Sequence, residues 1–188
     1  MPQSELLKQV LRVLEGAGIE YMATGSVVSS LQGEPRATHD IDLIVALKPQ
    51  AVPKLVTAFP SPQYYLEESG IREAIRRRGM FNLVETTEGD KVDFWLLTDD
   101  PFDRSRFSRR RTEEVLGVRM FVSSPEDTIL AKLAWAKKSG GSERHFTDAL
   151  RVYEVQSDRL DRGYLETWAQ RLSVEPWLRD IQEKAEKL

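Results

Sequence analysis

The chain contains 188 residues, of which 27 are lysine or arginine and 30 are aspartate or glutamate, so its formal net charge is −3. At 40% hydrophobic and 30% charged residues, the composition is typical of one globular domain that removes about 70% of the unfolded chain's surface from water. The absence of cysteine excludes a disulfide framework, a thiolate nucleophile and a cysteine-ligated metal centre. Two histidines are too few for a structural zinc site without cysteine.

No apolar run approaches the ~18 residues that a membrane helix needs. The first residues, MPQSE, lack the basic and then apolar layout of a secretory signal. We therefore expect a cytoplasmic protein. The slightly acidic balance disfavours a basic coat over the whole surface but leaves room for a local basic face.

The first two thirds of the chain alternate between helical and extended patterns. Apolar residues at helical spacing predict helices at 4–16, from Gly25 through Leu31, and at 49–59, 69–78 and 102–108. Short apolar or alternating runs predict strands at 19–24, 41–46, 81–86 and 91–97, and a last strand or hairpin over 114–122, interrupted at 116–117. The turn at 87–90 contains Gly-Asp, which predicts that the strands on either side of it form a hairpin.

From Ser124 onward the pattern is helical throughout. Ser124 precedes Pro125 and has Asp127 three residues later, an arrangement that caps and starts a helix. Further helices are expected near 143–156, after Asp161 and near 174–187. The sequence therefore predicts an α/β (α+β) fold, with a mixed sheet flanked by helices. We expect a core over 1–123 and a helical C-terminal region over 124–188 that packs on this core.

Three acids stand where strands are expected. Asp40 and Asp42 are two residues apart, so in an extended strand their side chains share one face while Ile41 points into the core. Asp93 interrupts an otherwise apolar strand, which is an unusual place for an acid. If the two strands are neighbours, three carboxylates converge, and ligands that are all oxygen select Mg²⁺ or Mn²⁺. For Asp40 and Asp42, the alternative is a strand edge with solvated acids.

The pair Gly25-Ser26 stands between an expected strand and an expected helix. Glycine there lets the backbone approach a phosphate, and a helix N-terminus favours anions. The Ser26 hydroxyl could donate to a terminal phosphate oxygen. With a metal at the acids, this layout suits in-line attack on a nucleoside triphosphate. Taken alone, a Gly-Ser pair is more often a turn and a helix cap.

Gly25-Ser26, Asp40-Ile41-Asp42 and Asp93, in this order, resemble the nucleotidyltransferase signature of the DNA polymerase β superfamily. The surrounding run RATHDIDL, at 36–43, is similar to the minimal bacterial members of that superfamily, the AbiEii-type abortive-infection toxin group. Softer matches lie within 124–133, 144–150 and 160–168. The resemblance spans nearly the whole chain and implies a nucleotidyltransferase-like mixed sheet.

The resemblance also implies roles for the acids. Asp40, Asp42 and Asp93 would bind Mg²⁺ or Mn²⁺, and Asp93 would in addition help to activate an acceptor hydroxyl.

Five further residues are candidates for nucleotide binding. Gly25 and Ser26 would hold the triphosphate of an NTP substrate. Lys132 resembles a lysine that the toxin group places near the phosphates, where it would act in binding and catalysis. From the residues alone, Lys132 also fits the polar face of a capped helix. Asp148 resembles a later acidic motif of the group, and Arg36 either contacts phosphate or pins its loop.

The activity implied is transfer of NMP from an NTP to an acceptor hydroxyl on RNA, such as tRNA, or on protein. As a toxin, the chain would have a cognate antitoxin as partner. Two alternatives stay open: a non-catalytic nucleotide-binding regulatory module of the same fold, and an enzyme that nucleotidylates a small molecule such as an antibiotic.

Two groups of arginines stand out from the rest of the chain. The first comprises Arg104, Arg106, Arg109, Arg110 and Arg111, and the second is the run Arg76-Arg77-Arg78. They form either solvated helix ends or patches for a polyanionic acceptor such as tRNA.

Overall fold

The computed structural model describes residues 3–35, 40–115 and 117–185. The chain divides into two compact units. The first takes its described residues from Met1–Thr24 and Thr38–Val122, and the second takes them from Gly25–Ala37 and Ser123–Leu188. The domain boundary expected from the sequence, after residue 123, stays a prediction. The second compact unit also contains the segment that follows Thr24, in addition to the C-terminal helices.

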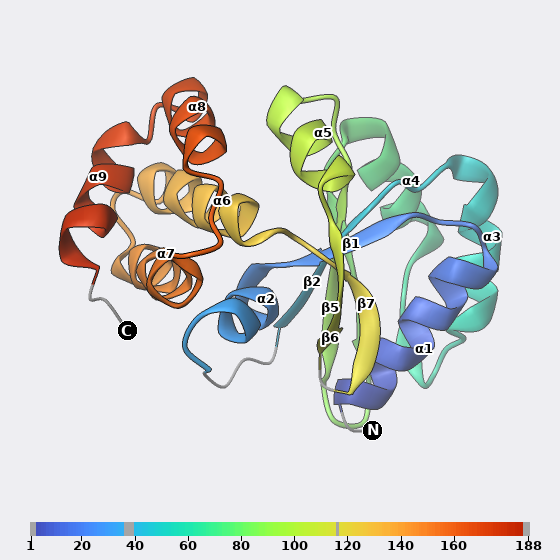
Figure 1. Ribbon diagram of the computed structural model, residues 1–188. Helices are drawn as coiled ribbons and strands as arrows, with labels where there is room; N and C mark the ends of the chain where they lie inside the picture. The colour runs from blue at the N-terminus through green and yellow to red at the C-terminus, as the bar shows by residue number, and fades with distance from the viewer. Residues whose placement is uncertain (1–2, 36–39, 116, 186–188) are drawn as a thin grey trace. The chain divides into compact units, whose positions relative to one another are not determined.

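The first unit is built around a mixed sheet (Figure 1). In the described residues this sheet has seven strands in the order β3-β4-β5-β2-β1-β7-β6. Its strands are β1 (Tyr21–Thr24), β2 (Asp40–Val45), β3 (Tyr64–Tyr65), β4 (Met80–Glu85), β5 (Lys91–Leu96), β6 (Arg111–Val115) and β7 (Val118–Val122). Strand β2 pairs in parallel with β5, and β1 pairs in parallel with β7, while the remaining neighbours are antiparallel. The predicted α/β fold with a mixed sheet is confirmed.

The central strand β2 is amphipathic in the manner of a half-buried strand. Ile41, Leu43 and Val45 are each at most 2% exposed and point to one face of the sheet. Asp40 and Asp42 alternate with them and therefore point to the opposite face. Apolar burial on one face thus fixes the face on which the acids lie, because a slip of one residue would bury both carboxylates.

Helices α1 (Gln3–Gly16), α3 (Val52–Ala58), α4 (Glu68–Arg77) and α5 (Pro101–Ser108), with the short 3₁₀ helix η1 (Pro49–Ala51), complete this unit. Helix α1 contacts α3 and β7, α3 contacts α4, and α4 contacts β4. The buried stripe of α1 consists of Leu6, Leu7, Val10, Leu11 and Leu14, which is the helical spacing read from the sequence. Within the sheet, the rings of Phe81 and Phe94 stack with centroids 4.8 Å apart.

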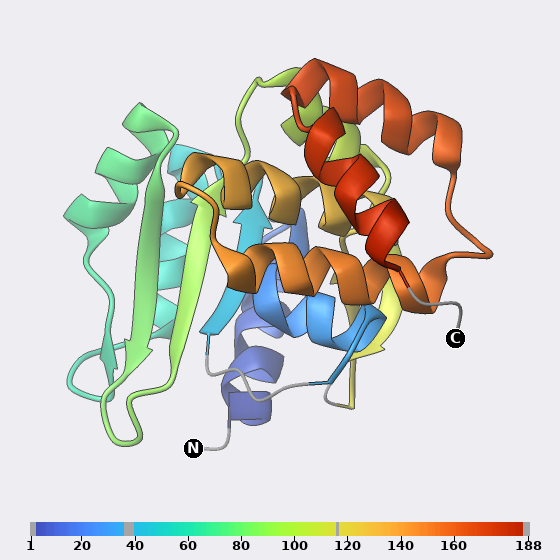
Figure 2. The same cartoon turned by 90° about the vertical axis from the view of Figure 1, so that its left-hand side faces the viewer.

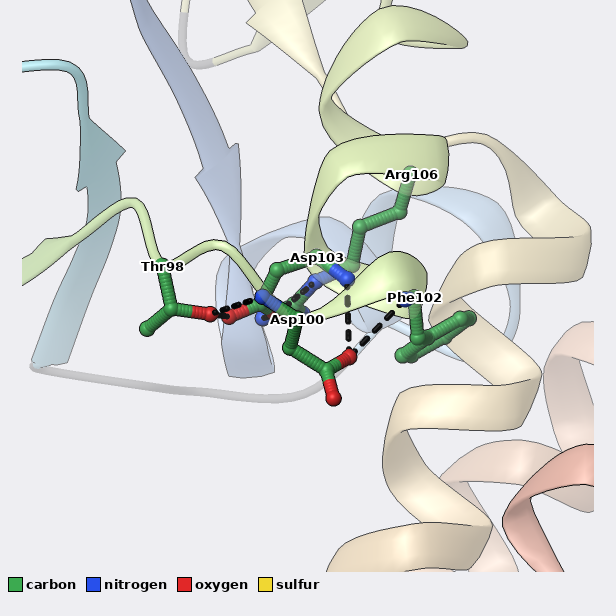
Figure 3. A network of polar contacts seen from close by, with 5 residues as sticks. All are labelled: Thr98, Asp100, Phe102, Asp103 and Arg106. Carbon is green, nitrogen blue, oxygen red and sulfur yellow. Dashed lines mark hydrogen bonds and ion pairs between the residues drawn. The ribbon is translucent and has the colours of Figure 1, made fainter.

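Helix α5 begins at a network of polar contacts (Figure 3). Asp100 is its N-cap and accepts hydrogen bonds from the backbone N–H of Phe102, at 2.8 Å, and of Asp103, at 3.3 Å. The hydroxyl of Thr98 donates to the Asp103 carboxylate, and Arg106 donates to the same carboxylate at 2.7 Å. These bonds hold α5 in place, so that its Phe107 is buried against the sheet.

That burial forms an apolar cluster beside the acids. Met22, Ile44, Leu97 and Phe107 are at most 6% exposed, and the half-buried Trp95 packs against them. Ile44 follows Asp42 at a spacing of two and faces Trp95 across the β2–β5 pair. On the face of the sheet that carries Asp42, the pair Ile44 and Trp95 is therefore apolar, and the pair two residues earlier, Asp42 and Asp93, is polar.

The second unit is all helical in the described residues and comprises α2 (Gly25–Gln32), α6 (Pro125–Lys138), α7 (Glu143–Gln156), α8 (Arg162–Leu172) and α9 (Glu175–Lys184). Figure 2 shows α6 and α7 side by side, with α2 alongside α7, in agreement with their contacts. Ser124 caps α6 by accepting from the N–H of Asp127, as its motif predicted. No helix in the described part of the chain has the length and apolar character needed to span a bilayer.

Most expected elements are present with ends shifted by one to three residues, and the hairpin of β4 and β5 around 87–90 is confirmed. The last strand or hairpin is present as the antiparallel pair of β6 and β7. It begins at Arg111 instead of residue 114, because the polar run Arg111–Glu114 is exposed on an edge strand and has no apolar alternation to reveal it.

Candidate active site

The acids singled out in the sequence lie on two neighbouring central strands. Strands β2 and β5 are parallel and adjacent, and Asp42 and Asp93 are direct partners in their register. Asp40 is the partner of Lys91. Residues paired in this way on adjacent strands point to the same face of the sheet, so Asp40, Asp42 and Asp93 share a face. The condition set by the sequence, that the two strands be neighbours, is met.

A polar row crosses the sheet at this level. Thr24 on β1 is the partner of Asp42, and Asn82 on β4 is the partner of Asp93. Thr24, Asp42, Asp93 and Asn82 are thus consecutive across four strands on one face. Sequence reasoning missed Thr24 and Asn82, since only the strand order and register bring them level with the acids.

Each of the two central carboxylates has a defined partner. Trp95 donates its indole N–H to Asp42 Oδ1 at 3.1 Å. The Lys91 ammonium lies 2.9 Å from Asp93 Oδ2 and 3.9 Å from Asp40 Oδ1. The hydrogen bond to Asp93 raises the pKa of Lys91 above its usual value, against the opposing effect of burial.

Asp93 is the most buried of the three acids, at 8% exposed, whereas Asp40 is exposed and Asp42 is half-buried. Its Oδ1 atom is fully buried and has no hydrogen-bond partner among the described residues. A buried carboxylate oxygen without a donor is costly unless a further cation or donor satisfies it. That oxygen, with the oxygen-only donor set, fits a hard divalent cation.

The side chains are not gathered as a finished metal site. Within residues 3–35, 40–115 and 117–185, no group of three or more aspartate, glutamate or histidine side chains has an arrangement that could hold a metal ion. The three carboxylates do not converge on one point as expected. Instead, Asp40 and Asp93 share the Lys91 ammonium. The metal roles of Asp40, Asp42 and Asp93 stay predictions.

Lys132 and Asp148 form a buried ion pair inside the helical unit. The Lys132 ammonium on α6 lies 2.6 Å from Asp148 Oδ2 on α7, and the two residues are 5% and 9% exposed. The Ser29 hydroxyl on α2 lies 3.4 Å from the same Asp148 oxygen. The pair thus links three helices of this unit. The alternative of a solvated Lys132 on a polar helix face is wrong, because the residue is buried.

Gly25 and Ser26 form the first turn of α2. Gly25 has a φ of 72°, a left-handed conformation that favours glycine and explains this residue at the strand-to-helix junction. Ser26 is half-buried, and its carbonyl oxygen accepts from the Ser29 hydroxyl at 3.2 Å. The triphosphate-binding role of Gly25 and Ser26 stays a prediction, and Arg36 lies outside the described residues.

Acids of the same unit lie against many of the arginines in the two groups. Arg106 pairs with Asp103 at 2.7 Å, and Arg110 pairs with Glu20 at 2.7 Å. In the second group, Arg76 pairs with Glu73 at 2.6 Å. Three further pairs are Arg77 with Glu73, Arg78 with Asp99, and Arg104 with Asp99. This pairing favours local neutralisation over a concentrated basic patch, and the polyanion hypothesis stays untested.

Comparison with solved structures places the chain in a fold class. An antigenic nucleotidyltransferase-like protein from Paracoccidioides brasiliensis matches with a TM-score of 0.50 at 15% identity, over 96% of this chain and 92% of that one. The antibiotic-resistance factor ANT(2'')-Ia matches with a TM-score of 0.52 at 11% identity, over 97% of both chains. The lincosamide antibiotic adenylyltransferase LnuA matches more weakly, with a TM-score of 0.45 at 14% identity, over 79% of this chain and 95% of that one.

No model of a known protein family matches the sequence, and no curated protein matches it. At the identities of the first two structures the likeness concerns architecture alone. The chain has a nucleotidyltransferase-like fold.

Proposed function

We propose that this protein is a divalent-metal-dependent nucleotidyltransferase that transfers NMP from an NTP to an acceptor hydroxyl on RNA, such as tRNA, or on protein. One observation carries the proposal: Asp42 and Asp93 lie opposite each other on β2 and β5, and Asp93 has a buried oxygen without a donor. The nucleotidyltransferase-like fold supports the same assignment. Fold alone does not define function, so the acids carry more weight than the likeness.

In this proposal the carboxylates of Asp40, Asp42 and Asp93 hold Mg²⁺ or Mn²⁺. A divalent ion bound there would neutralise charge on the triphosphate and lower the pKa of an oxygen ligand. Gly25 and Ser26 are proposed to hold the triphosphate, on the strength of the sequence resemblance, and Arg36 is proposed to contact a phosphate because it precedes Asp40 by four residues. Lys132 is proposed to act near the phosphates and Asp148 to orient it, which is consistent with their 2.6 Å contact.

The chemistry is a single displacement at the α-phosphorus. The acceptor oxygen forms a new bond to that phosphorus, and the bond from phosphorus to the oxygen bridging the α and β positions breaks. Pyrophosphate leaves with the bonding electron pair. The acceptor's proton passes to a carboxylate, for which Asp93 is proposed, since a general base must lie within hydrogen-bond reach of the proton it takes.

The proposal is tested by incubating the protein with Mg²⁺, labelled NTPs, tRNA and total cell protein. We expect label transfer, and we expect Asp42→Asn to lower its rate at least about a hundredfold, because that variant removes a ligand charge at the metal. Asp158→Asn is the matched control, since Asp158 is exposed in the loop after α7. Transfer that is unchanged by Asp42→Asn would contradict the assignment.

Two other outcomes have defined meanings. If NTP and Mg²⁺ together raise the melting temperature but label reaches no acceptor, the non-catalytic nucleotide-binding module is favoured. If induced expression stops growth, Asp42→Asn relieves the arrest and a neighbouring reading frame restores growth, the AbiEii-type toxin assignment with a cognate antitoxin is supported.

Nucleotidylation of a small molecule is the second candidate. It is favoured by the likeness in fold to an antibiotic-resistance factor over 97% of both chains. A panel of hydroxyl-bearing antibiotics, supplied with labelled NTPs in place of macromolecular acceptors, separates the two candidates. Transfer to a panel member and not to tRNA or protein would replace the first assignment by the second.

A further inference from the structure

Lys91 places a positive charge among the carboxylates of the candidate active site. It lies on β5 two residues before Asp93, so both side chains point to the same face of the sheet. Its register partner across the strand pair is Asp40. The side chain is 35% exposed, and its ammonium lies 2.9 Å from Asp93 Oδ2 and 3.9 Å from Asp40 Oδ1.

This ammonium pairs with two of the carboxylates, those of Asp40 and Asp93, that the proposed function gives to a metal ion. A carboxylate oxygen at 2.9 Å from an ammonium nitrogen is a full hydrogen-bonded ion pair. The opposite oxygen of Asp93, Oδ1, is buried without a donor, so the lysine satisfies only half of this carboxylate. A divalent ion could satisfy the carboxylate more fully, and the repulsion between the two cations favours movement of the ammonium away from Asp93.

We propose that Lys91 is the resident counter-ion of these carboxylates, which holds Asp40 and Asp93 when no metal is bound and must leave Asp93 before a divalent ion binds there. This inference rests on the proposed function for the identity of the metal ligands. It explains why donor atoms suited to a metal are present without a gathered metal site in the described residues. The long, partly exposed lysine stem can withdraw its charge toward solvent without disturbing the β5 backbone.

The first test measures metal binding directly, by titration with Mn²⁺ followed by electron paramagnetic resonance. We expect Lys91→Met to bind Mn²⁺ with a Kd about tenfold lower than that of the wild type, because the competing cation is gone. Lys54→Met is the matched control: Lys54 is exposed on α3, and the substitution removes the same charge. The double variant Lys91→Met/Asp93→Asn should lose the gain. Equal or weaker binding by a folded Lys91→Met protein would overturn the inference.

A second measurement uses the wild-type protein and so does not depend on whether the variant folds. Brief reductive methylation, read by mass spectrometry, reports how accessible the Lys91 ammonium is. We expect Mn²⁺ to increase modification of Lys91 several-fold while modification of Lys54 stays constant. Unchanged or reduced labelling of Lys91 at saturating Mn²⁺ would show that the metal does not displace it, and would overturn the inference.

Failure of the inference and failure of the proposed function give different results. If label transfer occurs and depends on Asp42, but removal of Lys91 leaves Mn²⁺ affinity unchanged, the function stands and the counter-ion role falls. If Lys91→Met tightens Mn²⁺ binding while no acceptor is labelled, the counter-ion role stands and the transferase assignment falls.

Discussion

Burial separates the charged side chains of this chain into two groups with different consequences. Most arginine and glutamate pairs are exposed, such as Arg72 with Glu68 at 2.6 Å, and exposed pairs contribute little to stability. Lys132 and Asp148 are buried together, and removal of either side chain leaves the other charge buried without its partner. Asp93 is buried beside a lysine that is itself only partly buried.

The buried pair gives the first prediction. Lys132→Met should lower the free energy of unfolding by about 3–5 kcal/mol, because the Asp148 carboxylate keeps its burial and loses its cation. The double variant Lys132→Met/Asp148→Asn should recover part of that loss, while the exposed Lys54→Met should change little. Urea denaturation measures all three variants. A double variant no more stable than Lys132→Met would show that the two charges are not coupled.

A second residue-scale prediction concerns pH and the hairpin turn. The backbone N–H groups of Glu88 and Thr87 donate to the Glu85 carboxylate at 2.8 and 3.0 Å. The bond from Glu88 is the main cause that lowers the pKa of Glu85 below its usual 4.5, and the bond from Thr87 adds to it, against the effect of burial.

Because this pKa is lower in the folded state, the carboxylate stabilises the fold above the unfolded pKa of 4.5, and this stability is lost as pH falls through the folded pKa. We expect Glu85→Gln to be less stable than the wild type at pH 7, with a difference that shrinks as pH falls below 4.5. Urea midpoints measured between pH 7 and pH 3 test this. The control is Glu166→Gln, on the exposed side of α8. A difference that is constant with pH would contradict the linkage.

At the scale of elements, the close approach of α2 to α7 depends on Gly33. A Cβ on Gly33, just after α2, would come within 2.8 Å of the Val152 backbone nitrogen and 2.9 Å of the Arg151 carbonyl carbon, both on α7. Only glycine lets the end of α2 reach the α7 backbone this closely. By contrast, a Cβ on Gly70 in α4 would meet nothing nearer than 3.9 Å.

The two glycines predict effects of opposite sign from the same substitution. Gly33→Ala should destabilise the protein by about 1–3 kcal/mol, because backbone atoms of α7 must shift. Gly70→Ala should stabilise it by about 0.5–1 kcal/mol, since alanine restricts the unfolded chain and favours a helix. Thermal melts monitored by circular dichroism compare the two variants with the wild type. Destabilisation by both would refute the steric argument for Gly33.

At the scale of the whole molecule, the helical unit is assembled from two distant segments of the chain. Gln32 at the end of α2 donates to the Ser123 carbonyl at 2.7 Å, and Gln156 on α7 donates to the Gln32 carbonyl at 2.9 Å. Val28 on α2 is fully buried. The C-terminal helices are therefore completed by a segment that precedes β2 in sequence.

Because the helical unit needs both segments, we can predict how its C-terminal segment behaves alone. Residues 123–188 alone should melt at a lower temperature and over a broader range than the intact chain, since α7 loses the apolar cover supplied by α2. Attachment of residues 25–35 through a flexible linker should restore a sharper transition, and the same fusion with Val28→Asp should not. Circular dichroism melts read all three fragments. A fragment that melts alone as sharply as the fusion would contradict the role given to α2.

Local chemistry made much of this molecule predictable from its sequence. The capping pattern at Ser124, the alternation around Ile41 and the Gly-Asp turn before β5 act over a few residues, so each could be recognised without knowledge of the rest of the chain. The same holds for the acids, whose types and spacing indicate a hard cation wherever the strands lie. An edge strand such as β6 escapes this reasoning in part, because exposed polar residues leave no pattern.

The tertiary structure alone decided which of these local features meet. Strands β2 and β5 are separated by β3, β4 and three helices in sequence, and only the sheet order makes them parallel neighbours with Asp42 opposite Asp93. The same register adds Thr24, Asn82 and Lys91 to the acids, none of which carries a signal of its own. Long-range pairing depends on the burial of all faces of the sheet at once, and this is a property of the whole chain that no single segment encodes.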